Sequence, residues 1–254
     1  MRQHVHLEFS TLGGRTELVR RRFGWPFFVG RQLRSPDAPT ASVVTLQSAS
    51  GTLNAGDETA TTVVVESDAH AVLRSQGAPS VHRSRAGGKA VEHTEVRVAE
   101  GGLAELVAEP RILFPGSHYE QTTDLHVQGA GRILFGEGIV ALRGESGATF
   151  SRYEAALRIF RDDALLVDDA SSTGGWGSMP GRIGDFLAFG HLVAVADGEL
   201  PSIGRDWNDS QRYLASTVLP NGAGVMVRIA AVDGRHLRRS LDDAASVLRA
   251  ALRA

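Results

Sequence analysis

The sequence predicts a mainly β fold, in which stacked or helically wound antiparallel sheets are followed by one C-terminal amphipathic helix. Three observations support this: apolar and polar residues alternate along many short segments, turn residues separate those segments at close intervals, and a helical period appears only near the end of the chain. Alternating βα units would require helical patterns between the strands. No linker and no repeat at a fixed period is visible, so a single domain over residues 1–254 is expected.

The alternating segments fill most of the chain and are bounded by turn residues such as Glu100-Gly101-Gly102. The segment 171–185 carries five glycines and a proline and is predicted to be a loop. Strands are expected at residues 4–9, 15–21, 42–47, 59–66, 69–75, 90–98, 103–108, 119–127, 132–142, 153–160, 165–168, 212–219 and 225–231.

The helical pattern lies at the end of the chain. Ser240 is the expected N-cap, with Asp243 three residues later as its capping-box partner. The leucines and alanines that follow share one helical face, while Arg249 and Arg253 fall in the last turns, where cations suit the helix dipole. We therefore expect a short amphipathic helix that packs on the β body or on a partner.

Composition excludes several classes of function. A net charge of −2 gives no basic excess for gripping nucleic acid, and nearly all positive charge is arginine, with Lys89 the one lysine. The absence of cysteine excludes disulfides and thiolate metal sites. The most apolar stretch, residues 186–196, is interrupted by Gly190 and His191 and is too short to span a bilayer. Residues 1–10 lack an apolar signal region, so a cytoplasmic, soluble protein without a membrane partner is expected.

Nucleotide-binding and nucleophile-elbow motifs are absent from the sequence, whereas two groups of histidines have spacings that suit metal ligands. His4 and His6 alternate on one strand face, which is either a solvated strand surface or a pair of imidazoles that can bind Ni(II) or Zn(II). A second strand face carries four side chains that are possible metal ligands. This face is either a solvated strand surface or the site of a cupin-like metalloenzyme. Its members are His118, Glu120, Asp124 and His126.

Carboxylates occupy conspicuous places at the ends of apolar strands or within them. Asp57 and Glu58 follow a glycine turn, and Asp168 closes a short apolar strand. Glu137 interrupts the apolar run 133–142. An unpaired carboxylate buried in such a run costs several kcal/mol, so Glu137 is hydrated, ion-paired or bound to a cation. The residues alone leave these alternatives open.

Several segments, in their order along the chain, resemble the urease accessory protein family UreD, also called UreH. Residues 13–16 read Gly-Gly-Arg-Thr, and the glycine-rich turn of the family is similar to SGTLNAGD at residues 50–57. GAPSVHRS at residues 77–84, the strand at residues 112–117 and the two apolar segments within residues 157–168 resemble later family motifs. The resemblance is closest over residues 5–170.

This resemblance implies a non-catalytic scaffold with a mainly β fold. Members of the family assemble with UreF and the GTPase UreG and dock on apo-urease, and a water-filled acidic passage carries Ni(II) to the urease site. By position, Asp57, Glu58, Glu137 and Asp168 would line the passage. Oxygen ligands in a wet channel release Ni(II) readily, so the resemblance implies transient nickel and no tightly bound cofactor.

Overall fold

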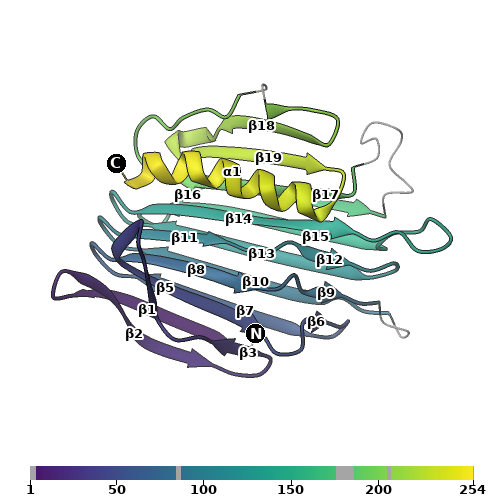
Figure 1. Ribbon diagram of the computed structural model, residues 1–254, viewed down its shortest axis with the longest axis horizontal. Coiled ribbons are helices and arrows are strands. Elements are labelled where there is room, and N and C mark those ends of the chain that lie inside the picture. Colours follow the sequence, from purple (N-terminus) through teal and green to yellow (C-terminus); the bar gives the residue numbers. More distant parts are fainter. Residues whose placement is uncertain (1–3, 84–86, 176–185, 205–206, 254) are drawn as a thin grey trace.

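The computed structural model describes residues 4–83, 87–175, 186–204 and 207–253. Two large β-sheets face each other, and one helix lies on the outer face of the second sheet (Figure 1). The first sheet runs in the order β16 (Ala164–Gly174), β15 (Arg152–Arg161), β13 (His118–Val127), β10 (Ala90–Val98), β7 (Glu58–Val65), β1 (Val5–Leu12) and β2 (Arg15–Phe23).

The second sheet is larger and has a short side branch. β12 (Arg111–Leu113) pairs with β14 and with β9 (Ser80–Val81), and β9 pairs with β6 (Thr52–Leu53), so these strands form a narrow third side. β4 (Leu33–Ser35) pairs with β5. The main order is β18 (Arg212–Val218), β19 (Gly224–Ala231), β17 (Ala188–Val195), β14 (Arg132–Ala141), β11 (Leu103–Val107), β8 (His70–Gln76), β5 (Ala38–Ser48) and β3 (Phe27–Val29).

The chain winds as a solenoid, because it passes from one sheet to the other at each turn: β7 leads to β8, β10 to β11 and β13 to β14. The prediction of a mainly β, wound fold with a C-terminal helix is confirmed. Antiparallel pairing, however, is confined to the ends of the sheets, and the central ladders are parallel. Short turns misled the prediction because they join strands of different sheets, and a strand of the opposite sheet supplies the crossover that parallel pairing needs.

The coils of this solenoid differ in length. In the first sheet Glu58 pairs with Val91, Val91 with Glu120, and Glu120 with Glu154, at unequal separations along the chain. Length differences are absorbed between strands, as in the segment that joins β14 to β15. The architecture is therefore repetitive in space although the sequence shows no fixed period.

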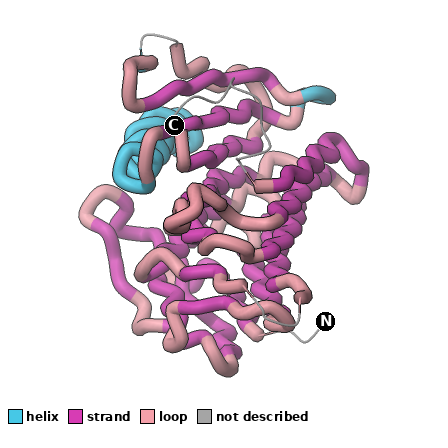
Figure 2. Tube along the Cα trace, turned by 90° about the vertical axis from the view of Figure 1, so that its right-hand side faces the viewer, coloured by secondary structure: helices cyan, strands magenta, loops and turns pink. Residues whose placement is uncertain are grey.

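The helix α1 (Gly234–Arg253) begins earlier than predicted. Asp233, and not Ser240, lies at its start: the Asp233 carboxylate accepts a hydrogen bond from the His236 amide at 2.9 Å. Ser240 is instead fully buried on the face that packs against the second sheet, together with Leu237 and Leu241. Figure 2 shows the helix on the outside of the paired sheets.

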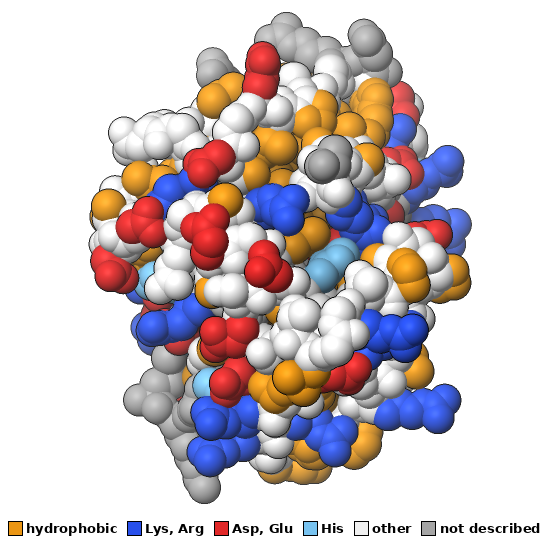
Figure 3. Space-filling view, turned by 90° about the vertical axis from the view of Figure 1, so that its left-hand side faces the viewer, with side chains coloured by type: hydrophobic (Ala, Val, Ile, Leu, Met, Phe, Trp, Pro, Cys, Tyr) orange, Lys and Arg blue, Asp and Glu red, His pale blue; other side chains and the backbone are white. Residues whose placement is uncertain are grey.

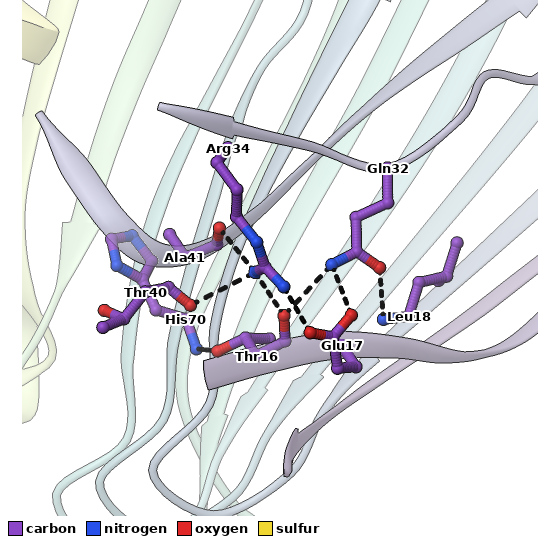
Figure 4. Close-up of polar contacts among 8 residues, drawn as sticks. All are labelled: Thr16, Glu17, Leu18, Gln32, Arg34, Thr40, Ala41 and His70. Atoms are coloured by element: carbon purple, nitrogen blue, oxygen red, sulfur yellow. Dashed lines mark hydrogen bonds and ion pairs between the residues drawn. The ribbon is translucent and has the colours of Figure 1, made fainter. Parts of the chain in front are cut away.

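β2 is an edge strand of the first sheet, and side chains bond to its outward backbone groups. The amide of Leu18 donates to Gln32 Oε1 at 2.9 Å, and Gln32 Nε2 donates to the Thr16 carbonyl at 3.2 Å (Figure 4). Arg34 donates to the same carbonyl and to the Ala41 carbonyl, the latter at 3.0 Å. These bonds occupy backbone groups of β2 that a second sheet could otherwise pair with.

One long strand was not predicted from the sequence, and one predicted loop needs correction. β17 (Ala188–Val195) is a strand that alternation does not reveal, because it is covered on both faces and most of its residues are apolar. The predicted loop at residues 171–185 is strand up to Gly174, at the end of β16. Its residues 176–185 lie outside the described part of the chain.

Candidate functional site

A belt of polar side chains crosses the interior between the two sheets, with apolar clusters on either side of it. Phe135 on β14 belongs to one cluster and Ile139 on the same strand to another, and Glu137 lies between them. Alternation along a strand turns all three side chains to the interior. Further members of the belt, contributed by neighbouring strands, are Glu92, Arg111, Gln121, Thr123, Tyr153 and His191, and the belt reaches the surface at the exposed pair Asp169 and Arg228.

Glu137 is the centre of this belt. Gln121 Nε2 donates to its Oε1 at 2.8 Å, and Thr123 donates to its Oε2 at 3.3 Å. The same Gln121 amide donates to the Tyr153 hydroxyl at 2.8 Å, which fixes the amide between the two acceptors. On the other side, His191 Nε2 lies 3.4 Å from Glu137 Oε1, because β14 and β17 pair these two residues directly.

Burial sets the protonation of both partners. It raises the pKa of Glu137 to about 7, against the opposing effects of the Arg111 charge and the Thr123 hydrogen bond. It lowers the pKa of His191 to about 4, and the positive charge of Arg228 acts in the same direction. The imidazole of His191 is therefore neutral near pH 7, while the Glu137 carboxyl is close to its midpoint.

Two cavities meet at Glu137. One of about 90 Å³ is lined by Glu92, Arg111 and Gln121, and the other of about 380 Å³ by Tyr153, His191 and residues further toward β18. Glu137 and Gly138 belong to the walls of both. A water molecule occupies about 30 Å³ of liquid, so the larger cavity has room for several. Glu137 thus stands where the two spaces adjoin.

Each cavity also has an ion pair in its wall. Arg111 donates to Glu92 with both Nε and Nη2, at 2.6 and 3.2 Å, in the smaller cavity. Arg228 donates to Asp169 at 2.7 Å in the larger cavity and joins the two sheets there. These four charges cancel in pairs, so ionised Glu137 adds one negative charge to the belt.

The structure does not bring the four predicted carboxylates together. Asp57 is exposed, and its Oδ2 accepts from the Asn54 amide at 2.7 Å, which stabilises the glycine turn. Glu58 is exposed at the start of β7, and Asp168 is exposed on the outer face of β16, in register with Arg158. Of the described residues that line the two cavities, Glu137 alone comes from the predicted set.

The histidine-rich face of β13 is on the outside of the first sheet, as predicted for a solvated strand face. Its side chains pair with neighbouring strands: His118 Nε2 lies 2.8 Å from Glu154, and Arg158 donates to both oxygens of Asp124. Within the described residues, no three His, Asp or Glu side chains are arranged to hold a metal ion. This face therefore gives no support to the cupin-like alternative.

Elsewhere on the surface, charges of both signs mix. His4 and His6 do not act as a free pair, since His4 Nδ1 accepts from the Ala60 amide at 3.3 Å and His6 lies 3.7 Å from Glu8. On the side shown in Figure 3, acidic and basic side chains are interspersed.

The sequence signalled Glu137 but not its partners. A carboxylate inside an apolar run marked Glu137, whereas His191 stood out only as an interruption of the stretch 186–196. Gln121 and Tyr153 look like ordinary strand residues. These residues come together because β13 pairs with β15 and β14 pairs with β17. Spacing along the sequence does not reveal either pairing.

Fold and site together define a β-solenoid protein with a polar belt and two adjoining cavities, of which the larger opens to the surface beside Tyr213 and Arg228. The belt offers carboxylate, amide, phenol and imidazole groups that can bind a cation or conduct protons and water. The chain belongs to the UreD urease accessory protein family, whose model matches residues 1–254. The family resemblance inferred from the sequence is confirmed.

Relatives from several organisms support this membership. The chain is 33% identical over 242 residues to urease accessory protein UreD of Mycolicibacterium smegmatis, covering 94% of this chain and 88% of that protein. It is 35% identical over 252 residues to UreD 3 of Bradyrhizobium sp. ORS 278, covering 96% and 89%. UreD of Haloarcula marismortui is 28% identical over 234 residues, covering 88% and 78%. Among the described residues, no helix has the length and apolarity to cross a membrane.

Proposed function

We propose that this chain is a non-catalytic scaffold that works in the cytoplasm with UreF and the GTPase UreG. In this proposal it binds apo-urease and helps to deliver Ni(II) to the urease active site. The observation that carries the proposal is the match of the whole chain to a family of urease accessory proteins. The nickel is cargo, and the chain needs no resident cofactor for this role.

The polar belt supports a passage for the cargo. Glu137 lies at the junction of the two cavities. The side chains beside it include the hydroxyl groups of Thr123 and Tyr153, whose oxygen atoms can act as metal ligands. Oxygen ligands and a single imidazole bind Ni(II) more weakly than a cage of thiolates or several histidines. A hydrated ion that exchanges its water for such ligands therefore stays free to move on.

Exposed aromatic side chains support a need for protein partners. Trp25 is 76% exposed, and Phe23 and Phe28, whose rings are in edge contact, are also exposed. Large apolar side chains gathered on a surface are typical of interaction sites. They do not distinguish UreF from UreG or urease.

The resemblance extends the passage role to Asp57, Glu58 and Asp168, which are exposed on the surface. We retain this as part of the proposal, because surface carboxylates can line a passage only where a partner covers them. Single variants separate the two situations. Loss of nickel delivery in a Glu137 variant reports on the interior, and loss of nickel delivery in a variant of one of the other three reports on a covered surface.

Co-expression of the chain with urease, UreF and UreG tests the proposal. Pull-down measures the complex, and urease activity with bound nickel measures delivery. We expect a complex with the parent chain, and with Asp57→Ala combined with Glu137→Ala a retained complex with little nickel incorporation. Full activation by that double variant would refute the passage, and failure to capture either UreF or urease would refute the scaffold.

A further inference from the structure

The two sheets do not end together at the side of the solenoid where β16 and β18 lie. Beyond β13 the first sheet has two strands, β15 and β16, whereas beyond β14 the second sheet has three, β17, β19 and β18. β18 therefore extends past the last strand of the first sheet, at the top of Figure 1. Tyr213 and Ala215, on the cavity side of β18, are exposed, while Leu214 on its other side is buried in the apolar cluster under the helix. Within the described residues, the inner face of β18 has no strand across from it.

The edge of β16 offers unpaired backbone groups. Asn221 Nδ2 donates to the Leu166 carbonyl at 2.8 Å, so this carbonyl points away from β15. Alternate residues of an antiparallel strand turn their N–H and C=O groups to the same side, and those of Asp168, Ala170 and Ser172 therefore point outward as well. Among the described residues, none donates to or accepts from these outward groups. This part of the strand also contains neither proline nor lysine, residues that commonly protect a sheet edge.

Two other edges are covered by the chain itself. At β2, the side chains of Gln32 and Arg34 bond to backbone groups. At β18, the Leu214 amide donates to Asn208 Oδ1. An unprotected edge strand is a ready template for pairing, so the open edge of β16 is a place where this fold can accept a further strand.

The space beside β16 has room for one strand. Neighbouring strands lie about 4.8 Å apart, and a strand added to β16 would lie across from β18, as β16 lies across from β19. A second copy of this chain does not fit there. Antiparallel pairing of β16 with the β16 of a copy would place two strands from each chain opposite three from each chain, so the two extending β18 strands would occupy the same space.

Side chains around this space indicate what the added strand carries. Asp168 is exposed on the outer face, and Arg158, its register partner on β15, is paired with Asp124. A basic residue therefore suits the outer face of the added strand. Tyr213 and Ala215 favour apolar residues on its inner face.

We propose that β16 accepts one extended segment of another protein, which adds an eighth strand to the seven of the first sheet and covers the inner face of β18. The segment carries apolar side chains on its inner face and a basic residue next to Asp168. Main-chain hydrogen bonds supply its affinity, and the alternating side chains supply its selectivity. This mode of recognition goes beyond the proposed function and does not depend on it.

Fluorescence anisotropy with a labelled peptide of the sequence RYEAALRIFR tests the proposal on the purified full-length chain. The probe copies β15, which already pairs with the other edge of β16 and places Arg158 opposite Asp168. We expect saturable binding of one peptide per chain. Ala170→Pro should weaken this binding at least about tenfold, because proline removes a hydrogen-bond donor and its ring obstructs the edge, whereas Ala170→Ser should leave it unchanged.

A second peptide, with proline at the position of Ala156, is the matched control for the probe. This position would face Ala170, and the second peptide should bind at least about tenfold more weakly. Tyr213→Ala tests the position opposite β18 and should also weaken binding. Hydrogen exchange gives a reading that needs no variant: amides within residues 168–172 should exchange more slowly in the peptide complex than in the free chain, and those of the capped edge strand β2 should not change.

Circular dichroism and urea midpoints establish that the variants are folded, and the second peptide and hydrogen exchange decide the question should Ala170→Pro not fold. Absence of peptide binding, equal binding to the parent and to folded Ala170→Pro, or unchanged exchange within residues 168–172 would overturn the proposal. Unchanged affinity in Tyr213→Ala would overturn the position opposite β18. A dimer in sedimentation velocity that Ala170→Pro dissociates would replace the segment by a second copy and would also overturn the proposal.

Discussion

Glu105 ties the C-terminal helix to the second sheet, and its replacement is expected to destabilise the fold. This carboxylate is 2% exposed on β11. Its oxygens lie 2.8 Å from His70 Nε2 and accept from Arg249 Nε at 2.6 Å and Arg253 Nε at 2.8 Å. Burial alone would raise its pKa, but the three donors outweigh burial and lower the pKa from 4.5 to about 2.

The pKa shift of Glu105 gives the size of its contribution to the free energy of unfolding. A folded pKa of about 2 for Glu105 against 4.5 in the unfolded chain corresponds to about 3 kcal/mol of stability. Because the folded value is the lower one, this contribution is complete above about pH 4.5 and is lost as pH falls toward 2. At pH 3.5 about 1.4 kcal/mol of it should already be gone.

Urea unfolding of the parent and Glu105→Gln at pH 7 and pH 3.5 measures the effect. The variant should be about 3 kcal/mol less stable at pH 7, and the gap should narrow by about 1.4 kcal/mol at pH 3.5. Asp242→Asn is the control: Asp242 pairs with Arg238 on the exposed side of the same helix, so its loss should cost less than about 1 kcal/mol. A difference in unfolding free energy between parent and Glu105→Gln of less than about 1 kcal/mol at pH 7, or one that does not change with pH, would refute the reasoning.

Three further predictions concern packing and capping, all measured by urea unfolding. Gly190→Ala should cost about 1–3 kcal/mol, because its Cβ would lie 2.7 Å from the Glu137 carbonyl oxygen, whereas Gly24→Ala, with nothing within 4 Å, should be nearly neutral; equal effects would contradict this. Asp233→Ala should cost about 1 kcal/mol through loss of the helix cap, and an unchanged midpoint would remove Asp233 from that role. Ser240→Ala should be neutral or stabilising, because its buried Oγ has no hydrogen-bond partner among the described residues, and a loss above about 1 kcal/mol would show that this hydroxyl is bonded.

Local patterns predicted most strands because one face of each is covered and the other is solvated. Residues 90–98 and 119–127 alternate for this reason, and their predicted bounds match β10 and β13 closely. Pairing direction was not predictable in the same way, since a turn looks alike whether it returns to the same sheet or passes to the opposite one. The helix start was misplaced because Ser240 and Asp243 also satisfy a capping box, and only packing shows that the helix already began at Gly234.

The site was predictable only at its centre. Glu137 stood out because a carboxylate in an apolar run needs compensation. His191 is 54 positions later in the sequence and becomes its neighbour through antiparallel pairing of β14 and β17. Asp57 and Asp168 were prominent in the sequence, but they lie on turns and outer faces that water already solvates.

The unequal coils have a consequence for how this chain tolerates changes in length. Insertions in the turns between strands leave the inward and outward faces of the neighbouring strands unchanged. A one-residue deletion within β14 before Glu137 would instead exchange its two faces, because side chains alternate with a period of two. Glu137 would then point at the helix and Gly138 at the cavities, so the parity of residues along one strand decides whether the carboxylate at the centre of the polar belt is there at all.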